Sequence, residues 1–223
     1  MEIKEMLSYV DHTQLQPYAT WEDIKKLCEE AIEYHTASVC IPPCYIKRVF
    51  NEYNNKNLNI CTVVGFPLGY STLQAKMEET KQALEDGANE VDMVINISDV
   101  KNGCFDAVKN EISELKKLTG DKVLKVIIET CYLTKEEKIK MCEIVTQAGA
   151  DYIKTSTGFG TGGATLEDIK LFKEHIGKDV KIKAAGGVRT LEDLENFIRE
   201  GCSRIGSSSA IKLAKGNTTS QGY

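Results

Sequence analysis

Two lysines lie within short apolar runs that have the composition of β-strands. Lys154 stands in the run DYIKTSTG, and Lys183 stands in the run VKIKAAGG. A lysine buried among apolar side chains loses hydration, which favours the uncharged amine, and a second ammonium nearby acts in the same direction. An uncharged amine at neutral pH is a nucleophile that can form a Schiff base with a carbonyl carbon. The pair therefore predicts imine chemistry on a carbonyl substrate.

A carboxylate in a third apolar run belongs with these lysines. Asp92 stands in EVDMVI, where side-chain alternation places it on the strand face opposite Val91 and Met93. If the apolar neighbours face a helix layer, the same alternation turns Asp92, Lys154 and Lys183 toward one interior. Two ammonium groups and a carboxylate can compensate one another there, and such clusters mark functional sites. We therefore predict Asp92, Lys154 and Lys183 as the catalytic residues.

The alternative is an ion cluster that only fills the interior of the sheet. Lys125 and Glu129 share one face of the run at 123–129 and fit that description. One buried charge alone would not separate the two interpretations. Three charges that share one face, on the fourth, sixth and seventh runs, favour the catalytic interpretation.

Strand-like runs alternate with amphipathic helical patterns along the whole chain. We predict strands at 9–12, 37–41, 59–65, 90–95, 123–129, 151–155, 181–184 and 203–206. Helices are predicted at 21–34, around Leu73, Met77 and Leu84, and from Phe105 onward. This order predicts an α/β protein in which parallel strands are joined by crossover helices. Eight units in 223 residues predict a single-domain (β/α)8 TIM barrel over residues 1–215. A doubly wound open sheet is the alternative, but the glycine motif expected after its first strand does not occur.

Four related tetrapeptides mark predicted helix starts. They are TWED from Thr20, TKEE from Thr134, TLED from Thr165 and TLED from Thr190. In each, a threonine hydroxyl can cap the helix while a carboxylate three residues later bonds back to the cap. Their repetition before apolar helical patterns supports the helix assignments.

Small residues after three of the predicted strands suggest where an anion would bind. Glycines allow backbone N–H groups to approach a phosphate, and in this fold the loops after strands seven and eight form the usual phosphate site. We predict substrate and phosphate contacts from those loops and from the loop after strand six: Gly158, Gly186, Gly187, Gly206, Ser208 and Ser209.

Composition excludes several other classes of protein. The net charge is −5, and no block of Lys and Arg indicates a nucleic-acid surface. No apolar run approaches the roughly 20 residues that span a bilayer, and the charged N-terminus does not resemble a signal peptide. We therefore expect a cytoplasmic protein without membrane or nucleic-acid partners. The eight cysteines contain no CxxC pair, which favours reduced thiols over a metal or disulfide role, and we predict no cofactor.

The same segments resemble the class I deoxyribose-phosphate aldolases. The similarity lies, in order, in VDHT from residue 10, VCIP from 39, VGFPLG from 64, EVDMVIN from 90, KVIIET from 125, KTSTGF from 154 and KAAGGVRT from 183. The resemblance implies reversible cleavage of 2-deoxy-D-ribose 5-phosphate to D-glyceraldehyde 3-phosphate and acetaldehyde. It implies that Lys154 forms the imine, that Asp92 handles protons, and that Lys183 tunes Lys154 and joins the proton relay. Some members carry a lysine at the position of Phe159.

Two other functions remain open from the residues alone. One is a metal-using sugar-phosphate epimerase on the same fold, which the scarcity of histidine disfavours. The other is a non-catalytic barrel that binds a phosphorylated metabolite and need not keep both lysines. A homodimer is compatible with the sequence. The small, polar composition of residues 216–223 predicts a tail. Tyr223 at its end could reach the predicted active site.

Overall fold

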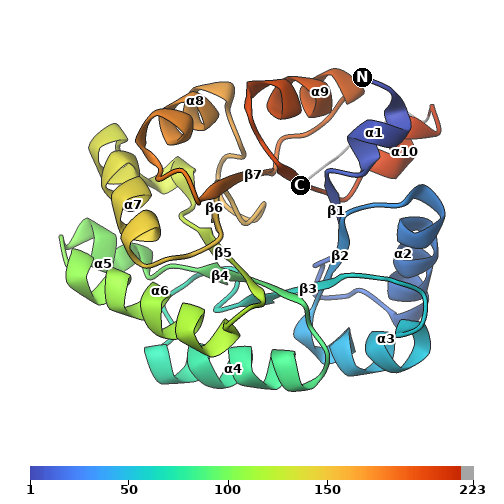
Figure 1. Ribbon diagram of the computed structural model, residues 1–223, viewed down its shortest axis with the longest axis horizontal. Helices are drawn as coiled ribbons and strands as arrows, with labels where there is room; N and C mark the ends of the chain where they lie inside the picture. The colour runs from blue at the N-terminus through green and yellow to red at the C-terminus, as the bar shows by residue number, and fades with distance from the viewer. Residues whose placement is uncertain (217–223) are drawn as a thin grey trace.

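Eight parallel strands form a closed barrel in the computed structural model, which describes residues 1–216 (Figure 1). Each strand pairs with the next in sequence, and the eighth pairs with the first. The strands are β1 (Val10–Thr13), β2 (Ser38–Ile41), β3 (Ile60–Val64), β4 (Glu90–Val94), β5 (Val123–Ile127), β6 (Tyr152–Lys154), β7 (Lys181–Ala185) and β8 (Arg204–Ser207). The predicted TIM barrel is confirmed.

Helices surround the barrel as an outer ring (Figure 1). They are α1 (Ile3–Leu7), α2 (Trp21–Tyr34), α3 (Ile46–Tyr53), α4 (Leu73–Glu85), α5 (Ile97–Lys101), α6 (Phe105–Thr119), α7 (Lys135–Gln147), α8 (Leu166–His175), α9 (Leu191–Glu200) and α10 (Ala210–Ala214). Two 3-10 turns, η1 (Pro43–Tyr45) and η2 (Thr130–Tyr132), follow β2 and β5. The predicted tail, apart from Gly216, lies outside the described residues, and so does Tyr223.

The four predicted helix starts are confirmed. Each threonine accepts a hydrogen bond from the backbone N–H three residues on. At Thr20, Thr134 and Thr190 the carboxylate also accepts from the threonine N–H, which completes the capping box. At Thr165 the hydroxyl instead donates to the Asp168 carboxylate. These caps fix where α2, α7, α8 and α9 begin.

Alternating side chains divide the barrel into two environments. On β4, Val91 and Met93 are fully buried in the main apolar cluster between barrel and helices. Their neighbours Glu90 and Asp92 turn into the barrel, where they are also buried. The predicted inward direction of Asp92 is therefore confirmed, and the register places Asp92 beside Lys125 and Lys154 beside Lys183 on adjacent strands.

Several predicted strands run one or two residues past the observed bounds, and the case that affects the site is the run at 123–129. Residues 123–129 read as one apolar run, but β5 ends at Ile127. Glu129 adopts a left-handed backbone conformation with φ of 50° at the start of η2. Strand alternation therefore ends before Glu129, so Glu129 does not share a strand face with Lys125 as predicted. Its side chain turns to the loop after β6 instead.

All eight cysteines are free, and Cys28, Cys40, Cys61, Cys142 and Cys202 are buried. Cys131 is half-buried, and Cys44 and Cys104 are exposed. Within residues 1–216, no helix combines the length and the apolar character needed to cross a membrane.

Candidate active site

Asp92 lies between the two lysines that the sequence singled out. Its Oδ2 atom is 2.7 Å from Nζ of Lys154 and 2.7 Å from Nζ of Lys183. The three residues come from β4, β6 and β7, and each is at most 3% exposed. The predicted convergence of Asp92, Lys154 and Lys183 is therefore present in the structure.

The contacts continue below this triad as a network of alternating charge. Lys183 donates to Asp11 on β1, and Arg204 on β8 lies 2.5 Å from the other oxygen of the same carboxylate. Arg204 also pairs with Glu90 at 2.9 Å, and Glu90 lies 2.5 Å from Lys125. Lys125 returns to Asp92 at 2.9 Å and closes the circuit. We call these seven side chains the interior cluster: Asp11, Glu90, Asp92, Lys125, Lys154, Lys183 and Arg204.

The cations of the interior cluster are unequally matched. Four basic side chains face three carboxylates, which leaves one positive charge in excess. Lys125 contacts three carboxylates within 4 Å, while Lys183 and Arg204 contact two each. Among the described residues, Lys154 forms an ion pair with Asp92 alone. Lys154 is therefore the basic side chain of the cluster with the fewest carboxylate contacts.

Charge pairing outweighs burial at three members of this cluster, Asp11, Asp92 and Lys183. Burial disfavours the charged carboxylate of Asp92, but Lys125, Lys154 and Lys183 hold its pKa well below the ordinary value. The pKa of Asp11 is likewise lowered, by Lys183 above all. Burial opposes the ammonium form of Lys183, yet the carboxylates of Asp11 and Asp92 raise its pKa. Asp92 is therefore an anion and Lys183 a cation at neutral pH.

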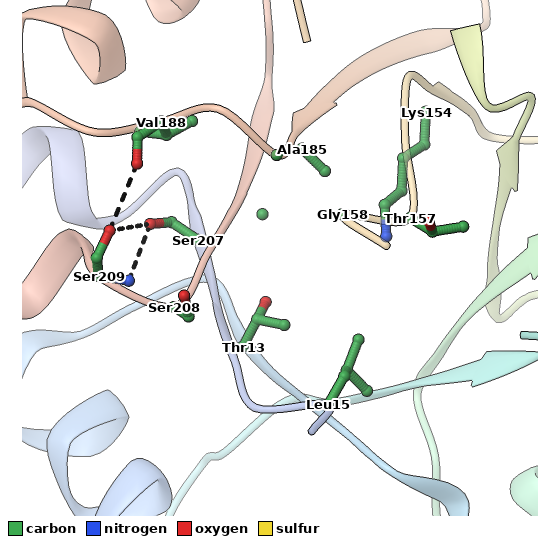
Figure 2. A pocket seen from close by; sticks show the side chains of 12 residues that line it. Thr13, Leu15, Lys154, Thr157, Gly158, Ala185, Val188, Ser207, Ser208 and Ser209 are labelled. Carbon is green, nitrogen blue, oxygen red and sulfur yellow. Dashed lines mark hydrogen bonds between the residues drawn. The ribbon is translucent and has the colours of Figure 1, made fainter. Parts of the chain in front are cut away.

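A pocket opens above the cluster at the carboxyl ends of the strands. Figure 2 shows Lys154 and Thr157 on one side of it and the turn of Ser207, Ser208 and Ser209 on the opposite side. The lining residues are Thr13, Leu15, Lys154, Thr157, Gly158, Ala185, Gly186, Val188, Gly206, Ser207, Ser208 and Ser209. Of the six predicted phosphate contacts, Gly158, Gly186, Gly206, Ser208 and Ser209 line this pocket. Gly187 follows Gly186 in the same loop but is not part of the lining.

Two glycine-rich loops meet beside the pocket through their backbones. A Cβ atom at Gly163 would lie 2.5 Å from the carbonyl carbon of Gly186, closer than any side chain tolerates. Ala164 N–H donates to the Gly186 carbonyl at 3.1 Å, and Gly186 has φ of +74°. Glycine is thus required where the loop after β6 packs on the loop after β7. This contact holds one wall of the pocket.

Glu129 approaches the same wall from the loop after β5. Its carboxylate accepts hydrogen bonds from the backbone N–H and the hydroxyl of Thr157, and Thr157 lines the pocket. Burial raises the pKa of Glu129 against the effect of those bonds. Glu129 thus orients Thr157 rather than joining the interior cluster.

Sequence reasoning missed Asp11, Glu90 and Arg204 as members of the cluster. Each is an acidic or basic residue within a strand, and alternation from Asp92 or from the apolar neighbours could have directed all three inward. Lys125 was assigned to interior filling, and the structure places it among three carboxylates. Thr13, the last residue of β1, and Leu15, which follows the strand, line the pocket but were not predicted as site residues.

In the part of the chain that the structure describes, two groups of side chains have a spacing that could suit a metal ion: Cys40, Cys61 and Asp92, and Asp11, Cys61 and Glu90. Lys125 lies against members of both, at 2.9 Å from Asp92, 2.5 Å from Glu90 and 3.3 Å from the sulfur of Cys61. An ammonium group already provides the positive charge that these ligands would offer to an ion. The geometry therefore fits an ion-paired lysine better than a metal.

Comparisons with known proteins agree over the whole chain. Residues 5–219 match the family model described as DeoC/LacD family aldolase. The chain is 69% identical over 223 residues to a deoxyribose-phosphate aldolase of Clostridium botulinum strain Alaska E43, covering all of both chains. It is 62% identical over 217 residues to that of Clostridioides difficile, covering 97% of this chain and 99% of the relative. A tetrameric deoxyribose phosphate aldolase structure from Aeropyrum pernix aligns with a TM-score of 0.90 at 31% identity, over 96% of this chain and 92% of that one.

Proposed function

The chain belongs to the DeoC/LacD family of aldolases, and we propose that it cleaves 2-deoxy-D-ribose 5-phosphate reversibly to D-glyceraldehyde 3-phosphate and acetaldehyde through a Schiff base on Lys154. Deoxyribose-phosphate aldolase is the activity named for the relatives that match it over their full length. The single observation that carries the assignment of the nucleophile is that, within residues 1–216, Lys154 at the edge of the pocket forms an ion pair with Asp92 alone.

Lys154 would attack the aldehyde carbon C1 of the open-chain sugar as the uncharged amine. Loss of water then gives a protonated imine, which withdraws electrons from the neighbouring bonds. The C2–C3 bond breaks, its electron pair forms the C1–C2 double bond of an enamine, and the C3 hydroxyl loses its proton to become the aldehyde of glyceraldehyde 3-phosphate. Protonation at C2 and hydrolysis of the imine release acetaldehyde and restore the lysine.

Asp92 and Lys183 would move the protons in this sequence. The Asp92 carboxylate lies beside the reacting amine and, through a water molecule, would accept the proton of the C3 hydroxyl. Lys183 remains an ammonium group against the same oxygen and would supply or replace the proton on this relay. General acid–base assistance of this kind accounts for about 10²–10⁴ in rate.

The serine and glycine end of the pocket would hold the substrate's phosphate. Ser208 and Ser209 offer hydroxyl groups, while Gly158, Gly186, Gly187 and Gly206 allow close approach of the backbone. The turn of Ser207, Ser208 and Ser209 lies opposite Lys154 in Figure 2, which suits a molecule whose reacting aldehyde and phosphate are at opposite ends.

We also propose that no metal takes part, because the protonated imine accepts the electron pair that a Lewis acid would otherwise stabilise. A chelator is then expected to leave turnover unchanged, and a large loss would favour the metal-using epimerase alternative. Residues 1–215 would form the single catalytic domain, with 216–223 as a tail. Eight free thiols suit the reducing cytoplasm.

Self-association is a further part of this proposal. An aldolase from Aeropyrum pernix is tetrameric, and for this chain we propose a homodimer. Sedimentation velocity at micromolar concentration distinguishes the two, and a tetramer or a monomer would overturn the dimer.

The decisive experiment traps the imine. Acetaldehyde followed by borohydride should leave an ethyl group on Lys154, identified by peptide mass spectrometry. Lys154→Met provides the matched control and should remain unmodified at the site. An adduct on Lys183 or Lys125, or no adduct in a protein with aldolase activity, would reject Lys154 as the nucleophile. Absence of both adduct and activity would reject the proposed function.

A further inference from the structure

Three charged side chains on two outer helices bind the backbone at the carboxyl ends of β3 and β4. On α4, Lys76 donates to the carbonyl of Val94 at 2.8 Å, and Glu79 accepts from the N–H of Gly65 at 2.7 Å. Glu111 on α6 accepts from the N–H of Asn96 at 3.3 Å and pairs with Lys76 at 2.7 Å. We call Lys76, Glu79 and Glu111 the α4–α6 anchor. No member of it belongs to the interior cluster or lines the pocket.

The anchor contacts the segment 65–69, which we call the mouth loop. A Cβ atom at Gly65 would lie 2.7 Å from the side chain of Lys76, so the loop passes directly over the lysine. At the other end, a Cβ atom at Gly69 would lie 1.9 Å from the carbonyl oxygen of Ile95. Gly69 N–H also bonds to the Gly65 carbonyl at 2.8 Å. The mouth loop is therefore held between Lys76 and the end of the strand that carries Asp92.

Phe66 connects the mouth loop to the pocket. Its side chain packs against a small apolar cluster inside the barrel formed by Leu15, Cys40, Cys61 and Val63. Leu15 lines the pocket. The ring of Phe66 also lies edge-on against Phe159, with centroids 5.3 Å apart, in the loop that carries Thr157 and Gly158. Movement of the mouth loop would consequently move one wall of the pocket.

The burial of Lys76 indicates that its ammonium group has a specific role. Its side chain is fully buried, and it is among the largest such side chains in the described part of the protein. An apolar residue of similar length could fill this space, and a buried ion pair seldom stabilises a fold more than apolar packing does. What an apolar residue could not do is bind the Val94 carbonyl and pair with the carboxylate that holds Asn96. The contacts therefore fit a role in fixing the strand ends.

We propose that Lys76, Glu79 and Glu111 are positioning residues that hold the mouth loop against β4 and so set how well the pocket binds the sugar phosphate. This inference rests on the proposed aldolase function. Imine formation by Lys154 depends on the interior cluster, which the anchor does not touch. Loss of the anchor should therefore weaken substrate binding much more than it slows the chemistry.

Lys76→Met provides the principal test. The KM for deoxyribose 5-phosphate should rise by about 10- to 100-fold while kcat changes less than about threefold, since a displaced wall loosens substrate placement. Lys138→Met is the matched control: Lys138 pairs with Asp168 between α7 and α8 at 2.6 Å and contacts no strand end. Its KM should be unchanged. An unchanged KM in Lys76→Met, or an equal rise in the control, would overturn the proposal.

Glu79→Ala keeps the test independent of folding. Glu79 bonds to the mouth loop from the helix surface, and its loss should raise KM in the same direction by about fivefold, since one hydrogen bond is worth about 1 kcal/mol. Hydrogen exchange gives a readout without activity: the Gly65 amide should exchange faster in Glu79→Ala, and the Asn96 amide faster in Lys76→Met. Unchanged exchange at both amides would reject the anchor. Wild-type protein without aldolase activity would instead reject the proposed function.

Discussion

The interior cluster and the Lys76–Glu111 pair of the α4–α6 anchor are both buried, but their charges respond to burial in opposite directions. In the interior cluster the pKa of Asp92 lies below its ordinary value and that of Lys183 above it, so both remain charged. In the anchor, burial lowers the pKa of Lys76 and raises that of Glu111, against the attraction between the two side chains. Pairing prevails in the first region, whereas burial prevails in the second.

The number of partners explains this difference. Each carboxylate of the interior cluster contacts at least two basic groups. Each buried charge therefore pays one desolvation penalty but gains the attraction of several opposite charges. In the anchor, one ammonium meets one carboxylate. A single buried pair recovers little more than its desolvation penalty. The comparison teaches that a barrel can keep many charges inside if each charge is shared among several partners.

Loss of the nucleophile should have the largest effect. Lys154→Met is expected to lower kcat/KM by a factor on the order of 10⁴ or more, because no other amine can form the imine in its place. Steady-state assay of aldehyde release measures it. Activity within tenfold of wild type would mean that the least-paired cation of the cluster is not the reacting one.

Lys125 tests whether the interior cluster is held by shared pairing. Lys125→Met removes the ammonium that contacts Asp11, Glu90 and Asp92, and should lower the free energy of unfolding by about 3–5 kcal/mol. Urea unfolding measures this change. Lys122→Met, at an exposed position three residues earlier, should change it by less than about 0.5 kcal/mol. Equal effects of the two substitutions would contradict the shared-pairing argument.

Acid dependence should follow the carboxylates of the interior cluster. The folded pKa of Asp11 is below its ordinary value of 3.8, so its contribution to stability is present above pH 3.8 and is lost as the pH falls toward the folded pKa. Asp11→Asn should lower the free energy of unfolding by about 2–3 kcal/mol at pH 7. The difference from wild type should shrink below pH 3.8 in unfolding curves recorded at several pH values. A difference that stays constant with pH would contradict the lowered pKa.

The smallest change in the free energy of unfolding is expected when Lys76 and Glu111 of the anchor are both replaced by apolar residues. Lys76→Met combined with Glu111→Leu should leave the free energy of unfolding within about 1 kcal/mol of wild type, because apolar packing replaces a pair that burial already disfavours. Lys76→Met alone leaves Glu111 unpaired and should be destabilising by about 3 kcal/mol. A double variant as unstable as the single one would show that the anchor is stabilised by its charges in the way the interior cluster is.

Side-chain alternation carried most of the site prediction. The strand containing Asp92 and the two strands containing Lys154 and Lys183 were long enough to show which residues share a face, so their convergence could be predicted. The same rule failed at Glu129, because the chain leaves the pleat after Ile127 and no residue type announces that turn. Gly186 and Gly187 were both predicted as phosphate contacts because they stand in the same glycine pair, but of the two only Gly186 lines the pocket.

The helix on the outer layer shows the limit of pattern reasoning. Leu73, Met77 and Leu84 mark α4 as amphipathic, and the helix is present over Leu73–Glu85. Its most buried residues are nevertheless Lys76, Thr80 and Ala83. An apolar stripe predicts which face turns inward only where the neighbouring element is also apolar, and here a carboxylate on α6 and a carbonyl on β4 receive the lysine.

By itself the sequence determined the eight strand–helix units, the capped helix starts, the family of the protein and the three residues expected to react, because each of these follows from local periodicity or from residues close together in the chain. The tertiary structure alone decided how the charges are shared. Asp11 and Arg204 are 193 positions apart, and Lys76 and Glu111 lie on helices separated by a strand. Which carboxylate contacts which amine depends on barrel closure and on helix packing. These contacts join residues far apart in the chain, so local sequence patterns do not predict them.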